Sequence, residues 1–182
     1  MVDAKEGATE QDTKVAGLAH EAGKACIIVV NKWDAVEKET KTMQNYKRKI
    51  KEKFNFMSYA PVLFISAKTG QRVQDLFECI NQVNDFNSLR ISTGVLNETL
   101  SRAVVKTPPP SHKGKRLKIY YMTQVSAKPP TFVFFVNKAE LFHFSYQHYI
   151  ENNLRETFKF TGTPIHFVIR EKGENAAFQP KI

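Results

Sequence analysis

Two short apolar runs, each followed at once by a polar loop, constrain the fold of this chain more than any other feature. The run at residues 25–30 leads into Asn31-Lys32-Trp33-Asp34, and the run at residues 61–65 leads into Ser66-Ala67-Lys68. A continuous apolar run is typical of a parallel strand that is covered on both faces. In a doubly wound sheet, ligands bind at the carboxyl ends of such strands. Both loops therefore occupy positions where a binding site is expected.

Helical patterns alternate with these two strands. Residues 9–20 begin with a capping-box-like Thr9-x-x-Asp12, residues 40–55 show apolar side chains at helical spacing, and a third helical pattern follows the second loop. The apolar stripes of the three helices contain Val15, Leu18 and Ala19; Met43, Tyr46, Ile50 and Phe54; and Val73, Leu76, Phe77, Ile80 and Val83. We interpret all three stripes as core-facing, which gives half of a doubly wound α/β sheet over residues 1–88.

The pattern changes near Asn87-Ser88. A helix is expected from Thr93 to Lys106, and Pro108-Pro109-Pro110 ends it. Alternation then predicts a strand with Leu117, Ile119, Tyr121, Thr123 and Val125 on one face and Arg116, Lys118, Tyr120, Met122 and Gln124 on the other. A strand over residues 131–136, a helix from Ser145 and a strand over residues 165–170 follow. Residues 89–171 are thus expected to form an α+β domain of order αββαβ, and residues 172–182 a frayed tail.

The residue types of the two loops suit recognition of guanine. An ionised Asp34 could accept hydrogen bonds from N1–H and from the N2 amino group of guanine, worth about 1.5–3 kcal/mol each, whereas adenine presents an acceptor there. Asn31 would contact the other edge of the base and tie the loops together, while the Ala67 N–H meets guanine O6. The stems of Lys32 and Lys68 could lie against the ring. Taken alone, N-K-x-D could be a turn of four common residues. The second loop, which begins with Ser66 and follows its own strand, favours recognition of guanine.

The residues that would bind the phosphates of a nucleotide are missing. The phosphate loop G-x-x-x-x-G-K-[ST] does not occur in the 182 residues, and Gly114-Lys115 is followed by Arg116. Asp3-Ala4-Lys5-Glu6-Gly7 resembles a switch D-x-x-G with one residue too many, and we interpret it as a strand end. Hydrolysis of GTP depends on positioning and electrostatics around the β- and γ-phosphates and Mg²⁺. We therefore expect no Mg²⁺ site, no catalytic residues and no GTP hydrolysis by this chain.

Several runs together carry a family resemblance. The N-K-W-D loop is followed, in order, by six further runs: Gly114-Lys115-Arg116-Leu117-Lys118-Ile119-Tyr120-Tyr121, Thr123-Gln124-Val125, Lys128-Pro129-Pro130, Phe132-Val133-Phe134-Phe135-Val136-Asn137, His143-Phe144-Ser145-Tyr146 and Gly162-Thr163-Pro164-Ile165. In this order they closely resemble the C-terminal part of the bacterial Der (EngA) family, from about Val2 to about Arg170. The resemblance implies two tandem GTPase domains and a KH-like domain, GTP or GDP as ligand, a cytoplasmic location and a role in assembly of the large ribosomal subunit. This chain would correspond to the back half of the second GTPase domain (1–88) and the KH-like domain (89–171), without the remaining GTPase domains.

Positive charge is concentrated in the second half. Residues 1–90 hold 14 Lys and Arg against 12 Asp and Glu, whereas residues 91–182 hold 13 against 6, and no acidic residue lies between Glu98 and Glu140. Such a stretch favours a phosphate backbone as partner, and Tyr120 and Tyr121 offer stacking surfaces, although at least one should be in the core. The candidate residues for docking on the ribosome or rRNA are Lys113, Lys115, Arg116, Lys118 and Lys128. A solvated face, or packing of the KH-like domain against the parent's GTPase domains, would also explain them. The G-x-x-G loop of RNA-binding KH modules is absent.

Other function classes receive little support. No apolar run approaches about 18 residues, so we expect no membrane span. Cys26 and Cys79 give neither a disulfide framework nor a metal spacing, and the five histidines are scattered. Half of a parallel sheet would leave a strand edge that other strands normally cover, which predicts a possible edge-to-edge dimer.

Overall fold

The computed structural model describes residues 1–37, 39–112 and 114–173, which form two compact units. The first unit contains residues 1–89 together with the segments 127–130 and 159–165. The second unit contains residues 90–126, 131–158 and the described residues from 166 onward. Each unit has its own three-stranded sheet. Among the described residues, no helix combines the length and the apolar composition that crossing a bilayer requires.

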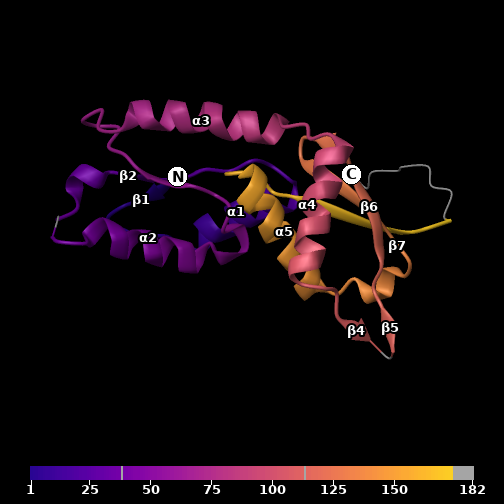
Figure 1. The fold of residues 1–182 in the computed structure, drawn as a ribbon. Helices are drawn as coiled ribbons and strands as arrows, with labels where there is room; N and C mark the ends of the chain where they lie inside the picture. The colour runs from indigo at the N-terminus through magenta and orange to yellow at the C-terminus, as the bar shows by residue number, and fades with distance from the viewer. Residues whose placement is uncertain (38, 113, 174–182) are drawn as a thin grey trace. The chain divides into compact units, whose positions relative to one another are not determined.

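The first unit is built on a parallel sheet of order β1-β2-β3, formed by Val2–Asp3, Ile28–Asn31 and Val62–Phe64. Val2 pairs with Val30, and Ile28 pairs with Val62. The unit also contains the helices α1 (Glu10–Glu21), α2 (Thr42–Lys53) and α3 (Val73–Ser88). A 3-10 turn at Trp33–Ala35 lies between β2 and α2, and another at Asn55–Met57 lies between α2 and β3. The sheet lies between α2 and α3 (Figure 1). This is the strand–helix alternation that the sequence predicts.

The core of the first unit lies between the sheet and α1 and α2. Trp33 is 2% exposed, and its ring centroid lies 4.5 Å from that of Phe64 and 5.5 Å from that of Tyr46. Ile50 and Phe54 of the predicted α2 stripe are buried in the same cluster, against which Met43 and Tyr46 pack. The capping box at the start of α1 is also present, with Thr9 and Asp12 exchanging hydrogen bonds. Aromatic packing therefore fixes the chain where β2 ends.

Two expectations for the first unit are wrong. The strand predicted at residue 25 begins only at Ile28, because the Cys26 N–H donates to the Gly162 carbonyl at 2.7 Å instead of to a neighbouring strand. The stripes of α1 and α3 are largely outside the core: Val15, Leu18, Phe77 and Ile80 are 56%, 69%, 56% and 46% exposed, and Val83 is the buried member of α3. A sheet of three short strands covers only part of each helix face.

The second unit combines two long helices with a mixed sheet. Its elements are α4 (Thr93–Lys106), β4 (Ser111–His112), β5 (Lys115–Arg116), β6 (Ile119–Ala127), β7 (Pro130–Val136), a 3-10 turn (Ala139–Leu141), α5 (Phe144–Phe158) and β8 (His166–Glu171). The sheet order is β6-β7-β8, and β7 and β8 are parallel. The predicted α/β and α+β classes are confirmed, with a small β4–β5 hairpin added to the αββαβ order. Of the predicted tail, residues 174–182 lie outside the described residues.

The face of β6 that contains Met122 points into the core of the second unit. Met122 is fully buried, whereas Tyr121 is 43% exposed. The Asn97 side chain of α4 binds the backbone of Met122 twice, accepting from its N–H and donating to its carbonyl, each at 2.9 Å. Gln124 accepts from the Ile91 N–H at 2.8 Å. The predicted alternation groups Met122 with Arg116 and Lys118, but Met122 is buried whereas those two cations are exposed.

Candidate guanine site and basic surface

The two loops of the candidate guanine site lie side by side because their strands are neighbours. β2 and β3 are adjacent and parallel, so their carboxyl ends meet at one edge of the sheet. The Ile65 N–H donates to the Val30 carbonyl at 2.8 Å, and the Trp33 N–H donates to the Ile65 carbonyl at 3.1 Å. These bonds continue the pairing past the strands and fix the starting points of both loops.

Asp34 is oriented by Ser66. The Ser66 hydroxyl donates to Asp34 Oδ1 at 2.5 Å and accepts from the Thr69 N–H at 3.2 Å. Ser66 is fully buried, and its N–H donates to the Gln71 carbonyl at 3.1 Å. The hydroxyl thus has a fixed position from which it holds the Asp34 carboxylate. Sequence reasoning did not single out Thr69 and Gln71, although a turn after S-A-K is a signal for such bonds.

Asn31 joins the two loops directly. Its Oδ1 accepts from the Ala67 N–H at 3.0 Å, across 36 residues of sequence. Because this N–H is engaged, its predicted contact with guanine O6 requires that the bond be shared or exchanged when a base enters. Lys68 is exposed beside it. The structure therefore brings together Asn31, Asp34, Ser66 and Ala67.

Lys32 is held at the same edge of the sheet by a third strand. Its backbone is left-handed, with φ 62°, and its Nζ lies 2.5 Å from Asp3 Oδ2. The hydrogen bond from Lys32, followed by one from the Lys5 N–H, holds the pKa of Asp3 below its usual value of 3.8. The same bond raises the pKa of Lys32. Sequence reasoning treated Asp3 only as a strand end; its place at the carboxyl end of the neighbouring parallel strand was the available signal.

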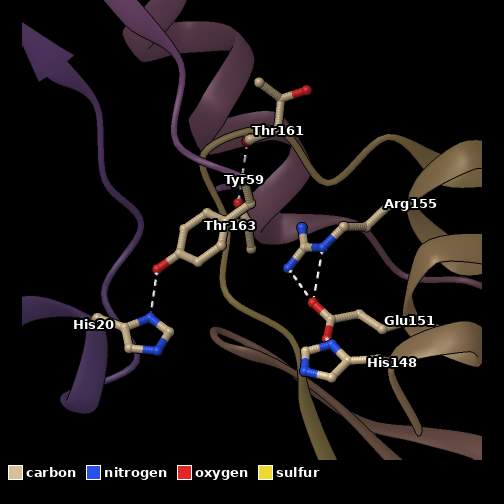
Figure 2. A network of polar contacts seen from close by, with 7 residues as sticks. All are labelled: His20, Tyr59, His148, Glu151, Arg155, Thr161 and Thr163. Carbon is tan, nitrogen blue, oxygen red and sulfur yellow. Dashed lines mark hydrogen bonds and ion pairs between the residues drawn. The ribbon is translucent and has the colours of Figure 1, made fainter. Parts of the chain in front are cut away.

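Two histidines, one in each unit, form polar contacts with neighbouring side chains. In the first unit, His20 Nδ1 lies 2.9 Å from the Tyr59 hydroxyl. In the second, His148 Nδ1 lies 3.7 Å from Glu151, which also accepts from Arg155 at 2.8 Å (Figure 2). Over residues 1–37, 39–112 and 114–173, no group of three or more His, Cys, Asp or Glu side chains could hold a metal ion.

The structure brings together three of the five predicted docking residues. Lys115 and Arg116 lie on β5 and Lys118 lies just before β6, all exposed. Lys128 follows β6 in the chain and belongs to the first unit. Lys113 lies outside the described residues.

Neither of the two neighbouring tyrosines is in the core. Tyr120 is 44% exposed beneath the Lys172 ammonium, and Tyr121 is 43% exposed and stacked on Phe135 with ring centroids 4.4 Å apart. The expectation that at least one of them is buried is wrong, because Met122 takes the core position on β6.

Both units match known protein families. Residues 1–85 match the GTP-binding domain of elongation factor Tu, and residues 90–170 match the KH-domain-like C-terminal domain of EngA bacterial GTPase enzymes. The chain is 62% identical over 172 residues to the GTPase Der of Acetivibrio thermocellus. The chain belongs to the Der (EngA) family. It is also 60% and 59% identical to the GTPase Der of Ruminiclostridium cellulolyticum and of Lachnospira eligens. These alignments include 94–96% of this chain, which spans 39–40% of the length of these Der relatives.

Proposed function

We propose that the first unit recognises the guanine base of GTP or GDP. The observation that carries this proposal is the bonding between the loops, Ser66 to Asp34 at 2.5 Å and Ala67 to Asn31 at 3.0 Å. A carboxylate held in one orientation can accept from N1–H and the N2 amino group of guanine together, and it repels the N1 lone pair of adenine. The curated relatives of this chain are GTPases by name, which agrees with a guanine nucleotide as ligand.

The affinity for nucleotide is expected to be low. The sequence contains no phosphate loop, so base contacts alone must hold the ligand. We expect a Kd for GDP in the millimolar range or weaker, which corresponds to about −4 kcal/mol or less. Hydrolysis of GTP by this chain is not expected for the same reason.

Amide chemical shifts of the ¹⁵N-labelled chain test this proposal. Millimolar GDP should shift the amides of residues 31–34 and 66–68, whereas ADP should leave them in place. Asp34→Asn should remove the response to GDP, because an amide cannot accept from both guanine donors. Asp85→Asn, at an exposed position on α3, is the matched control. Equal shifts with ADP, or micromolar binding of GDP, would contradict the proposal.

We propose that the second unit docks the parent protein on rRNA of the large ribosomal subunit, in the cytoplasm, as part of subunit assembly. The support is the acid-free stretch between Glu98 and Glu140 and the exposure of Lys115, Arg116 and Lys118. Exposed cations attract a phosphate backbone without reading its sequence. This mode of contact does not require the absent G-x-x-G loop.

A second candidate role is packing against the GTPase domains of the parent protein. It is favoured by apolar side chains on the two helices of the second unit: Val95, Val105 and Phe144 are 45%, 82% and 74% exposed. The edge strand β1, which pairs only with β2 among the described strands, is a corresponding candidate for self-association of this chain. Sedimentation at rising concentration tests the dimer, and a monomer throughout would exclude it.

Binding to purified large subunits separates docking from packing. The variant Lys113→Glu/Lys115→Glu/Arg116→Glu/Lys118→Glu should lose binding. A control with Lys5, Lys14, Lys24 and Lys53 changed to Glu has the same net charge and should keep it. The wild-type affinity should fall steeply with salt. Equal loss in both variants would reduce the effect to net charge, and absence of binding by the wild type would favour the packing role.

A further inference from the structure

The β3 strand has an open edge. It pairs with β2 on one side, and no other described strand pairs with its second side. The Ile28 N–H donates to the Pro61 carbonyl, and the Ile65 N–H donates to the Val30 carbonyl, so residues 61 and 65 direct their backbone groups toward β2. Successive residues of a strand direct these groups to opposite lateral sides of the strand. The N–H and C=O of Val62 and Phe64 therefore point away from β2, within the plane of the sheet. These are the groups that a further strand would bind.

Two hollows follow this open edge. One has a volume of about 690 Å³ and the other about 250 Å³, and both are lined by Lys47, Val62, Leu63 and Asp75. Phe64 lines the smaller hollow, and Pro61 lines the larger one. The hollows therefore form a groove whose floor is β3 and whose walls are α2 and α3.

The two walls carry opposite charges along the larger hollow. Lys47 and Lys51 project from α2, and Asp75 and Glu78 project from α3. In the smaller hollow, Arg72 at the start of α3 is an additional cation, and its guanidinium lies 3.8 Å from the Met43 sulfur of α2. The four charged side chains of the larger hollow are exposed, and none of them forms an ion pair within the described part of the chain. The acidic wall disfavours a nucleic-acid backbone as the occupant, since Asp75 and Glu78 would repel its phosphates. An extended peptide can satisfy both walls, because its side chains alternate between the two faces of a strand.

We propose that this groove binds an extended peptide that adds to β3 as a fourth strand. Its acidic side chains would face Lys47 and Lys51, and its basic side chains would face Asp75 and Glu78. Main-chain hydrogen bonds to Val62 and Phe64 supply affinity, and the two charged walls supply specificity. The partner is thus a segment with period-two alternation of acidic and basic residues. This inference does not depend on guanine recognition, since it uses none of the residues of that site.

The probe is a capped octapeptide of alternating Glu and Lys, titrated into the ¹⁵N-labelled chain. The amides of Val62 and Phe64 should shift in a saturable way, and their hydrogen exchange should slow. Two further peptides test the geometry: octaglutamate carries acids on both faces, and a fully N-methylated Glu-Lys octapeptide cannot donate to β3. Both should bind at least tenfold more weakly. Binding of either with the affinity of the probe would overturn the proposal, because it would show simple charge attraction.

Variants of the groove test the role of each wall. Lys47→Glu/Lys51→Glu leaves both walls acidic and should lose the response of Val62 and Phe64. Arg48→Glu/Lys49→Glu makes the same charge change on α2 outside the groove and should keep it. The fourfold variant Lys47→Glu/Lys51→Glu/Asp75→Lys/Glu78→Lys should recover binding, because the peptide can shift by one residue. Equal loss in the two double variants would overturn the proposal, and this comparison stands even if the fourfold variant does not fold.

Discussion

The two units hold their candidate recognition residues in different ways. In the first unit, Asp34 and Asn31 are hydrogen-bonded to residues 32 and 36 positions away in sequence, so bonds within the chain hold the site together. In the second unit, Lys115 and Lys118 have exposed side chains on a short hairpin and at the start of a strand. A fixed carboxylate can distinguish one base from another, whereas exposed cations attract any phosphate backbone. Substitutions should therefore affect stability in the first region and mainly binding in the second.

Trp33→Ala should have the largest effect on stability. The ring is 2% exposed and packs on Phe64 of β3 and Tyr46 of α2, so its removal leaves a cavity and should cost about 3–5 kcal/mol. Lys115→Ala, in the exposed region, should change the free energy of unfolding by less than about 0.5 kcal/mol. Urea unfolding measures the free energy of unfolding of both variants. It is followed by circular dichroism because Trp33→Ala removes the only tryptophan and with it the tryptophan fluorescence. A cost below 1 kcal/mol for Trp33→Ala would show that packing does not hold the loop.

Ser66→Ala should have a smaller effect in the same direction. The Asp34 carboxylate would lose a donor and the Thr69 N–H would lose an acceptor, which should cost about 1–3 kcal/mol. Ser58→Ala, at an exposed position of the same unit, controls for the loss of a hydroxyl. Guanine-dependent shifts should also disappear in the first variant and persist in the second. Unchanged stability of Ser66→Ala would mean that the two loops are held by their strands alone.

The sequence predicted the elements of both units better than it predicted their faces. The helix expected at residues 93–106 has those bounds, and both polar loops follow parallel strands. These features depend on local signals, namely the helical periodicity, the prolines after Lys106 and the continuous apolar runs. Such signals act within a few residues of the element that they define, so they are legible without tertiary information.

The errors concern what lies opposite an element. Periodicity shows that Phe77 and Ile80 share a face of α3, but it does not show that the described sheet leaves that face exposed. Alternation separates Tyr121 from Met122, but the Asn97 side chain of α4 decides which of them is buried. The contact of Lys32 with Asp3, for which no prediction was made from the sequence, also joins residues at the ends of two strands. Each error thus arises where a distant partner determines the outcome.

Tyr146→Phe tests whether a buried titratable group in the second unit controls its pH response. The Tyr146 hydroxyl donates to the Thr107 carbonyl at 2.8 Å, and burial, with a smaller effect of Tyr149, raises the pKa of Tyr146 to about 12. The unfolded chain ionises first, near the usual value of 10. Stability should therefore fall as pH rises from about 10 to about 12, and this slope should weaken in Tyr146→Phe.

At neutral pH the same variant should lose about 0.5–1.5 kcal/mol, the net value of one hydrogen bond. Tyr149→Phe is the matched comparison at that pH, because it also removes one hydroxyl hydrogen bond to a backbone carbonyl, that of Ala103 at 2.9 Å. Urea unfolding at several pH values gives both quantities. An unchanged alkaline slope in Tyr146→Phe would assign the pH response to other groups.

The smallest effect is expected for the ion pair between Lys32 and Asp3 at the edge of the guanine site. The Lys32 side chain of this pair is exposed, like the cations of the second unit and unlike the partner of Asp34. The pKa of Asp3 is lowered in the folded chain, so the contribution of the pair is present above the usual value of 3.8 and is lost as pH falls through the lower, folded pKa. Lys32→Met should raise this pKa toward 3.8 without reaching it, because the Lys5 N–H still donates to Asp3 at 2.8 Å. Lys5→Met keeps that N–H and should leave the pKa low. NMR titration of the Asp3 carboxyl measures its pKa in the wild-type chain and in the two variants. If Lys32→Met leaves the pKa of Asp3 unchanged, the backbone N–H alone lowers that pKa. Asp3 would then be held by a bond within the chain, as Asp34 is, and would differ in the same way from the exposed cations of the second unit.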